Sequence, residues 1–427
     1  MSLSLCSINV RGIRHLLKRK AIFLYCKRFN ADFYFLQETH ACSSDLSFWK
    51  NQWGNDIWLS YGNNHSAGVA VLRGAFKGKV ISSKTHHSGR WLILTVNFNS
   101  EMFLLGNIYA SNNKPNNRIL FQEFEEEINR VIGVFQDIKI ILGGDFNSVS
   151  NVMIDRYPPP NRSCIVNPEF NNLCLGLGLV DIWRSKYPDK KEFTWSNKDM
   201  SRQSRIDFWL ISNSLDNSVV KVSIEPSILT DHKVIFLSLN INGSEVKPNR
   251  SYWKLNSRLL EDDNFKMDAK DIIQDNWRKA QLFKSYGKYW ELMKYEIRQT
   301  AMKRGKEIAE LKRLREDKLV KEILSLISME DLDEEGKGQL FSLQLEMDRM
   351  YEERAKGAFV RSRRRWLEEG EKNTKYFYNL ERKNSEFTAI HKLNIMKTPK
   401  IFQNMFRISM VTFIPVMPVL LVTYLPF

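Results

Sequence analysis

The sequence predicts an α+β domain followed by an all-α helical extension, and two observations lead to this fold class. Residues 1–241 contain short apolar runs separated by turn-forming residues, with helical patterns between them. Strands and helices mixed in this way favour two mixed β-sheets flanked by helices, a four-layer α/β sandwich. Beyond residue 241 the pattern becomes helical and highly charged. We therefore expect a domain over 1–241, a linker over 242–258, a charged helical region over 259–394 and a divergent apolar tail over 395–427.

Alternation of polar and apolar residues locates the strands of the first domain. The expected strands are Leu3–Val10, Phe33–Gln37, Gly68–Leu72, Trp91–Asn97, Phe103–Tyr109, Lys139–Leu142, Asp207–Ile211 and Val234–Asn240. Helical periodicity predicts helices at Lys18–Phe29, Ile119–Phe135 and Glu169–Leu175. Several of these runs alternate polar and apolar residues, as half-buried antiparallel strands do.

The linker and the charged region are predicted from composition. Gly243, Ser244 and Pro248 are typical of a connecting segment. The stretch Arg298–Ile327 is expected to form a solvated helical hairpin or coiled coil, and a break is expected near Asp331–Gly338. Its apolar stripe comprises Ile308, Leu311, Leu314 and Leu319. A second helix should run to about Glu368 and carry Arg361, Arg363, Arg364 and Arg365, with Phe359 and Trp366 beside them. This run is either a solvated basic face or an RNA-contacting surface.

Composition restricts the class of protein. The chain has 427 residues and a net charge of +15, which suits a polyanionic partner but also an ordinary basic protein. Five cysteines, an odd number without a C-x-x-C pair, argue against a disulfide framework or a zinc site. We therefore expect a reducing compartment, the nucleus or the cytoplasm. No obligate protein partner can be inferred.

Neither end of the chain predicts membrane insertion. The first apolar run precedes the charges of Lys18, Arg19 and Lys20, the reverse of a signal peptide. Residues Ile408–Phe427 carry no charge and are long enough to span a bilayer. Prolines at 415, 418 and 426 interrupt this segment, and no cationic anchor follows it. We expect no membrane anchor here.

Polar residues at the ends of the predicted strands suggest chemistry. Hydrolysis of a phosphodiester needs a cation near the phosphate, a base for water and donors to the non-bridging oxygens. The candidates are Asn9, Glu38, Tyr109, Asp145, Asn147, Asp207, Asp231 and His232. Each could by itself be a turn-former or a surface residue. Together they supply hard oxygen ligands for Mg²⁺, an orienting carboxylate and a histidine, so they predict a metal-dependent phosphodiesterase.

The motifs around these residues resemble the endonuclease/exonuclease/phosphatase superfamily, which includes DNase I. Within it the chain is most similar to the endonuclease of LINE-type (non-LTR) retrotransposon proteins. The motifs are Leu-Gln-Glu-Thr-His at Glu38, Gly-Gly-Asp-Phe-Asn at Asp145, Phe-Thr-Trp at Thr194, Ser-Arg-Ile-Asp at Asp207 and Thr-Asp-His at Asp231. Two later segments, Tyr252–Asn256 and Trp366–Phe377, resemble the connector between that endonuclease and a reverse transcriptase.

The resemblance implies roles for individual residues. Glu38 and Asn9 would bind Mg²⁺, with Mn²⁺ as a possible substitute; Asp145, Asn147, Asp231 and His232 are further candidate ligands. Tyr109 and Asn147 would hold the scissile phosphate, and Asp145 would transfer a proton at the leaving oxygen or the attacking water. His232 would be a general base or a phosphate ligand oriented by Asp231, with Asp207 as a supporting acid. Thr194, Ser204 and the neighbouring Arg205 would contact phosphate or DNA. The residue that activates water stays open.

The implied function is a Mg²⁺-dependent DNA endonuclease whose nick leaves the 3′-hydroxyl that primes retrotransposition. No Phe-x-Asp-Asp or Tyr-x-Asp-Asp motif occurs in the chain, so we expect a protein truncated before the polymerase. One alternative is an abasic-site repair nuclease or another phosphoesterase of the superfamily. A second alternative is a non-catalytic remnant that binds nucleic acid.

Overall fold

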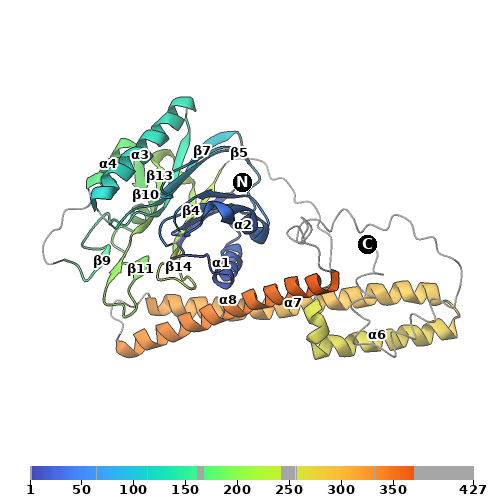
Figure 1. Cartoon of the computed structure of the whole chain (residues 1–427). Helices are drawn as coiled ribbons and strands as arrows, with labels where there is room; N and C mark the ends of the chain where they lie inside the picture. The colour runs from blue at the N-terminus through green and yellow to red at the C-terminus, as the bar shows by residue number, and fades with distance from the viewer. Residues whose placement is uncertain are drawn as a thin grey trace. The chain divides into compact units, whose positions relative to one another are not determined.

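The computed structural model describes residues 2–63, 65–112, 114–135, 137–160, 168–241, 255, 257–327, 329 and 333–369 (Figure 1). These residues form two compact units. The first contains the described residues up to 241 together with those from Leu319 onward. The second contains the described residues from Leu255 to Lys318.

One mixed sheet of six strands has the order β14-β15-β1-β2-β4-β3. Its strands are β1 (Ser2–Asn9), β2 (Phe33–Gln37), β3 (Ile57–Ser60), β4 (Val69–Arg73), β14 (Val219–Glu225) and β15 (Val234–Asn240). Strands β1 and β2 are parallel, and the other pairs are antiparallel. The strand predictions in this half are confirmed, whereas β3 and β14 were not predicted.

The second mixed sheet also has six strands, in the order β10-β13-β8-β7-β6-β5. They are β5 (Lys79–Thr85), β6 (Trp91–Phe98), β7 (Glu101–Tyr109), β8 (Lys139–Asp145), β10 (Leu179–Asp181) and β13 (Asp207–Ser212). Only β7 and β8 run parallel among these neighbours. A small third sheet joins β9 (Arg156–Tyr157), β11 (Trp195–Ser196) and β12 (Gln203–Ser204).

Alternating side chains bury both faces of each six-stranded sheet. In β1, Leu3 and Leu5 point into the core between the sheets, while Cys6 and Ile8 belong to the outer core. This two-residue period is the one expected of strands covered on both sides. The inner core receives aromatic and branched residues from both sheets, including Phe33, Phe103 and Trp209. Two sheets packed in this way account for the long apolar runs of the sequence.

Helices cover the outer faces, which completes the four layers (Figure 1). Helices α1 (Leu16–Arg28) and α2 (Leu46–Trp53) pack on the first sheet, and α3 (Lys114–Val134) and α4 (Pro168–Gly176) pack on the second. The short α5 (Ile182–Lys186) and two 3₁₀ segments, Ser43–Asp45 and Asn213–Ser218, complete the elements described up to residue 241. A third 3₁₀ segment, Ser257–Glu261, precedes the helical extension. The predicted fold class, a four-layer sandwich with a helical extension, is confirmed.

The helical extension consists of α6 (Asp263–Leu282), α7 (Tyr286–Ile327) and α8 (Glu334–Glu369). The break predicted near Asp331–Gly338 is confirmed between α7 and α8. In the second unit, α6 and the first half of α7 share a core that includes Phe265, Ile273 and Trp290. The predicted apolar stripe is wrong in part, since Leu311 and Leu314 are more than half exposed. They belong to neither core, because Ile308 packs against the core of the second unit and Val320 is the next residue of α7 in the core of the first.

The end of α7 and the whole of α8 contribute to the first unit. Val320, Ile323 and Leu340 are buried in the same cluster as Ile22 and Tyr25 of α1. One boundary between the two units therefore falls within α7, between Lys318 and Leu319. The limits of the linker and of the charged region stay predictions.

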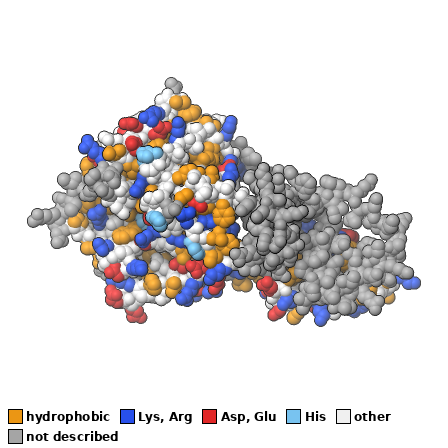
Figure 2. All heavy atoms as spheres, in the orientation of Figure 1, with side chains coloured by type: hydrophobic (Ala, Val, Ile, Leu, Met, Phe, Trp, Pro, Cys, Tyr) orange, Lys and Arg blue, Asp and Glu red, His pale blue; other side chains and the backbone are white. Residues whose placement is uncertain are grey.

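Several predicted features lie outside the described residues. They are residues 242–254 and 256 of the linker, residues 370–394 of the charged helical region, and the tail 395–427; the side chains of residues 360–369 are likewise outside them. Among the described residues, no helix combines the length and apolarity that crossing a membrane requires. On the face seen in Figure 2, Lys and Arg side chains are scattered among acidic and apolar ones, without a single basic patch.

Candidate active site

The predicted site residues gather at one edge of the sandwich because their strands end there. Tyr109 at the end of β7 pairs with Asp145 at the end of β8, and Asp145 also pairs with Asp207 at the start of β13. In the facing sheet, Asn9 is the last residue of β1 and Glu38 follows β2. His232 lies just before β15. Residues from both sheets thus converge, as the conjunction of motifs predicts.

Two glycines allow Asp145 to reach its buried position. A Cβ atom at Gly143 would lie 2.2 Å from the Trp209 ring, and one at Gly144 would lie 2.1 Å from the Ile108 carbonyl oxygen. Gly144 also has a φ of 140°, which L residues rarely adopt. The sequence Gly-Gly-Asp therefore lets β8 pack closely against both neighbours. Asp145 itself is 1% exposed.

His232 is held by Asp207. Its Nδ1 lies 3.0 Å from Oδ2 of Asp207, and its Nε2 faces Oδ2 of Asp145 at 3.9 Å. Burial opposes a charge on this imidazole, but the attraction of Asp207 and its hydrogen bond raise the pKa of His232 to about 9. The ring is therefore protonated at neutral pH in the protein as it stands, with Nδ1–H donating to Asp207. Such a cation can attract a phosphate oxygen.

The orienting role that the sequence analysis gave to Asp231 is wrong. Oδ2 of Asp231 accepts hydrogen bonds from Arg11 Nη1 at 2.6 Å and from Trp195 Nε1 at 2.9 Å. No hydrogen bond joins it to His232 among the described contacts. The His232 ring instead bonds Asp207. The Oδ1 oxygen of Asp231 is buried without a hydrogen-bond partner among the described residues.

Asn9 links the two sheets at the site. Its Nδ2 donates to Asp145 Oδ2 at 2.9 Å, and its Oδ1 accepts from the backbone nitrogen of Arg11 at 3.0 Å. The other Asp145 oxygen accepts from the backbone nitrogen of Asn147 at 2.9 Å. Burial and the nearby Asp207 carboxylate nevertheless raise the pKa of Asp145 to about 7. This carboxyl can therefore gain or lose a proton near neutral pH.

Glu38 and Tyr109 form the more open side of the site. Glu38 has a φ of 52°, which turns the chain sharply after β2, and its Oε1 lies 3.4 Å from Nε2 of His40. Burial and the charges of Glu38 and Asp145 raise the pKa of Tyr109, so its phenol stays protonated. The Arg90 guanidinium lies 4.8 Å from the centre of the Tyr109 ring. Tyr109 can thus donate a hydrogen bond next to a cation.

The side chains of Asn147 and Thr194 form hydrogen bonds with backbone atoms. Asn147 has a φ of 45°, and its Nδ2 donates to the Ala110 carbonyl at 2.7 Å. Thr194 is fully buried, and its Oγ1 accepts from the backbone nitrogens of Ile206 and Asp207 at 3.0 and 3.1 Å. Thr194 therefore fixes the start of β13 and with it Asp207. Ser204 pairs with Trp195 across β11 and β12.

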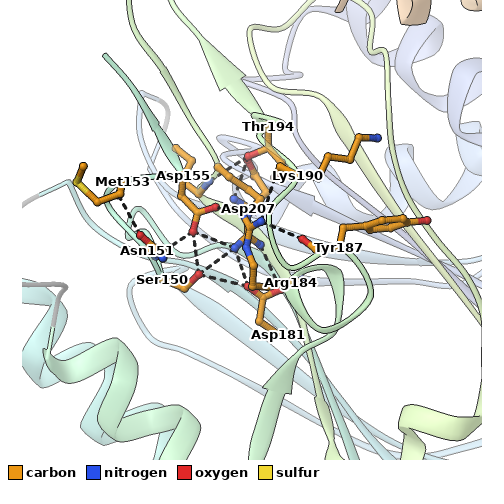
Figure 3. A network of polar contacts seen from close by, with 12 residues as sticks. Ser150, Asn151, Met153, Asp155, Asp181, Arg184, Tyr187, Lys190, Thr194 and Asp207 are labelled. Atoms are coloured by element: carbon orange, nitrogen blue, oxygen red, sulfur yellow. Dashed lines mark hydrogen bonds and ion pairs between the residues drawn. The ribbon is translucent and has the colours of Figure 1, made fainter. Parts of the chain in front are cut away.

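The assignment of Arg205 to DNA contact is wrong. Arg205 is 1% exposed, and its Nε donates to Asp155 Oδ1 at 2.8 Å while Nη2 donates to Asp181 Oδ2 at 2.7 Å. Figure 3 shows the surrounding network, in which Arg184 joins Asp155 and the backbone carbonyl of Tyr187. Burial opposes the charge on Asp155, but its hydrogen bond from Arg205 holds its pKa below the usual value. Arg205 thus anchors the β11–β12 region.

Sequence reasoning missed residues that support the site from below and beside it. Asn107 of β7 is buried between the sheets, where its Oδ1 accepts from Gln37 Nε2 at 2.7 Å and its Nδ2 donates to the Ala70 carbonyl at 2.8 Å. The amide of Asn107, within the otherwise apolar run Leu-Leu-Gly-Asn-Ile, could have indicated a buried polar contact. Arg11 and Trp195, which hold Asp231, stand within the motifs Asn-Val-Arg-Gly and Phe-Thr-Trp.

The sequence of this edge also matches a known family. The profile of the Endonuclease/Exonuclease/phosphatase family covers residues 6–232. The chain belongs to this family. The match begins within β1 and ends at His232, so it spans every site residue considered above.

Individual relatives extend the comparison. The chain is 27% identical over 389 residues, 90% of its length, to the Transposon TX1 uncharacterized 149 kDa protein of Xenopus laevis, of which it spans 29%. It is 25% identical over 258 residues to the whole Exodeoxyribonuclease of Bacillus subtilis (strain 168), across 56% of this chain. Among solved structures, the Xenopus laevis APE2 catalytic domain is 17% identical, with a TM-score of 0.47 over 57% of this chain and 94% of that one.

The buried acidic cluster can hold a metal ion. Ligand atoms of Asp145, Asp207 and His232 all lie within 4.8 Å of one another. Two carboxylates in such a place repel each other, as the raised pKa of Asp145 indicates, and a cation would relieve this repulsion. The residues present therefore fit a metal.

Proposed function

We propose that this protein is a Mg²⁺-dependent DNA endonuclease that nicks one strand and leaves a 3′-hydroxyl, of the kind that primes retrotransposition. The observation that carries the proposal is the Asp207–His232–Asp145 arrangement, in which the buried His232 ring lies with Nδ1 3.0 Å from Asp207 and Nε2 3.9 Å from Asp145. A site with a fixed cation and a proton-transferring group suits phosphodiester cleavage. The likeness to a transposon protein beyond residue 232 supports the retrotransposon context.

Metal binding is proposed for the open side of this edge. Glu38 and Asn9 offer hard oxygen atoms, the ligand type that Mg²⁺ prefers, and Asp145 lies 2.9 Å from Asn9 Nδ2. Asn147, Asp231 and His232 are further candidate ligands, and His232 would have to lose a proton to bind, because only a neutral imidazole coordinates a metal. When bound, Mg²⁺, or Mn²⁺ in its place, would neutralise phosphate charge and the leaving oxygen.

Proton transfer is divided between Asp145 and His232 in this proposal. The imidazolium of His232 attracts a non-bridging oxygen, and Asp207 keeps its charge and orientation. Asp145 then takes the proton of the attacking water or returns one to the leaving oxygen, because its carboxyl faces His232 and burial raises its pKa above the usual value. The Tyr109 phenol and the amide of Asn147 donate to the phosphate. Since a protonated histidine cannot accept a proton, Asp145 is the better base.

A plasmid-nicking assay tests the proposal. The full chain should convert supercoiled plasmid to relaxed circles with Mg²⁺ and not with EDTA. Glu38→Ala and His232→Ala should each abolish conversion, while Glu126→Gln, a change of an exposed carboxylate on α3, should not. Absence of nicking by the wild-type chain, or equal nicking by a Glu38→Ala, His232→Ala double variant, rejects the endonuclease.

An abasic-site repair nuclease is the second candidate, because Recombination repair protein 1 of Drosophila melanogaster is 28% identical to this chain over 272 residues. The same preparations should be given intact duplex, duplex with one abasic site and a small phosphoester. We expect comparable cleavage of intact and abasic duplex. Cleavage confined to the abasic duplex would favour repair, and salt-dependent binding without any turnover would favour the non-catalytic remnant.

The remaining assignments follow from the same proposal. DNA is the partner of the sandwich, and RNA is a candidate partner of the charged helical region. Action on DNA implies the nucleus, at least for part of the protein's life. These assignments rest on the family and on the transposon relative.

A further inference from the structure

Helix α8 reaches the loop that carries His232. The carboxylate of Asp348 in α8 accepts a hydrogen bond from the backbone nitrogen of Leu229 at 2.8 Å, although the two residues are 119 positions apart. Leu229 stands three residues before His232. The helical extension is therefore connected to the active-site edge by one specific polar contact within the first unit.

The contact acts on a strained residue. Leu229 has a φ of 57°, in the left-handed region that non-glycine residues with large side chains avoid. Such a conformation persists only where its surroundings enforce it. The acceptor on Asp348 satisfies the Leu229 N–H in that conformation, while Ile228 beside it is fully buried. Asp348 thus stabilises the turn at its most strained point.

Packing of α8 holds Asp348 in place. Leu340, Met347, Tyr351 and Ala355 are all at most 2% exposed, and their spacing puts them on one face of the helix. The Tyr351 ring meets the Tyr25 ring of α1 edge-on, with centroids 5.0 Å apart. The hydroxyl of Tyr25 in turn donates to the Pro226 carbonyl, at the start of the same loop. The loop is therefore braced at both 226 and 229.

Further hydrogen bonds connect the loop 226–232 to the residues of the active site. Thr230 Oγ1 donates to the Asn9 carbonyl at 2.8 Å, and Ser227 Oγ donates to the His232 carbonyl. The loop 226–232 is thus fixed between α8 on one side and the Asn9 strand end on the other. A shift at Leu229 would displace the His232 ring relative to Asp145 and Asp207.

We propose that Asp348 is a positioning residue for His232, so that the end of the helical extension completes the active site of the sandwich. Asp348 does not touch substrate or metal; it acts through Leu229. The catalytic part of this inference rests on the proposed function, whereas the positional part concerns His232 whatever the site does. The unit that cuts would then comprise the sandwich and α8, and not residues 1–241 alone.

Three variants of the full chain test the inference. Asp348→Ala removes the acceptor, Asp348→Asn keeps an oxygen acceptor in the same place, and Glu353→Ala changes an exposed carboxylate on α8. In the nicking assay, Asp348→Ala should lower kcat between about tenfold and 10²-fold at nearly unchanged KM, as expected of a misplaced catalytic group. Asp348→Asn should restore kcat, and Glu353→Ala should match the wild type.

The imidazole NMR resonances of His232, identified by their loss in His232→Gln, give a readout that needs no turnover. They should move in Asp348→Ala and stay in place in the other two variants. If the wild type fails to nick DNA but these shifts occur, the proposed function fails and the positioning role stands. The inference is overturned if Asp348→Ala merely lowers Tm while leaving both kcat and the His232 resonances as in the wild type.

Discussion

The Nδ1 atom of His232 lies 3.0 Å from Asp207, a residue 25 positions earlier, and not beside Asp231, its neighbour in the chain. The interaction joins the start of β13 to the segment two residues before β15. It couples the orientation of the imidazole to the pairing of β13 with β8, the strand that ends in Asp145. Two sheets and three strand ends therefore have to be in place before the site is complete.

The first prediction separates the two aspartates. Asp207→Asn should lower kcat by about 10²–10⁴-fold, the range for loss of a positioned acid–base group, because it removes the charge that keeps His232 protonated. Asp231→Asn keeps an oxygen acceptor for Arg11 and Trp195 and should lower kcat less than Asp207→Asn does. The NMR titration of His232 gives the check: its pKa should fall below about 9 in Asp207→Asn. If Asp231→Asn lowers kcat as much as Asp207→Asn or more, Asp231 and not Asp207 orients His232.

This aspartate pair illustrates how far the sequence could lead. It was predictable that Glu38, Asp145 and His232 stand at strand ends and converge there. A strand end is visible in the sequence as the point where an apolar run gives way to polar residues. The partner of His232 was not, since sequence adjacency favoured Asp231 and only the pairing of β13 with β8 puts Asp207 at the ring. Contacts across a sheet depend on register, which a single sequence does not reveal.

Other differences have similar physical causes. Strand β5 was missed because Lys79–Thr85 is polar and mostly exposed at a sheet edge. Arg205 looked like a DNA contact because its two carboxylate partners stand 50 and 24 positions earlier in the chain. The buried face of α8 was missed because its apolar residues are far apart along a charged helix. In each case tertiary contacts outweigh the local pattern.

The second prediction concerns the metal. Mg²⁺ should raise the Tm of the wild type, by the equivalent of about 2.7 kcal/mol at a concentration 100 times Kd. Burial and Asp207 raise the pKa of Asp145 to about 7, so the effect should grow from pH 6 to pH 8 as this carboxyl loses its proton. Glu38→Gln and Asp145→Asn should reduce the shift, and Glu126→Gln should not. A wild-type Tm that is the same with and without Mg²⁺ at both pH values would refute a metal site.

The third prediction concerns Arg205. Arg205→Ala leaves the buried Asp155 and the half-buried Asp181 without their main partner, so it should cost about 3–5 kcal/mol of unfolding free energy. Arg202→Ala, on the exposed turn between β11 and β12, should cost little. Urea unfolding compares the two variants. A stable Arg205→Ala protein with weakened DNA binding would instead support direct contact with DNA.

The fourth prediction works out the sign of a pH effect at Asp348. Burial raises the pKa of this carboxyl to about 6, so the folded state holds its proton more tightly than the unfolded state does. Its ionisation therefore destabilises the fold as pH rises from about 4 to 6, and the full cost applies above pH 6. Asp348→Asn should raise stability at pH 7 by about 1 kcal/mol, or roughly 2–4 °C in Tm. The gain should vanish at pH 4; a gain that persists there would contradict this account.

The end chemistry of the cut strand tests the central claim most directly. Supercoiled plasmid is incubated with the full chain and Mg²⁺, and the relaxed product is treated with a DNA ligase, which needs a 3′-hydroxyl and a 5′-phosphate. The account predicts relaxed circles that the ligase reseals without other treatment, and no relaxed circles with His232→Ala. Absence of nicking, or nicks that ligase cannot close until a 3′-phosphate is removed, would contradict it.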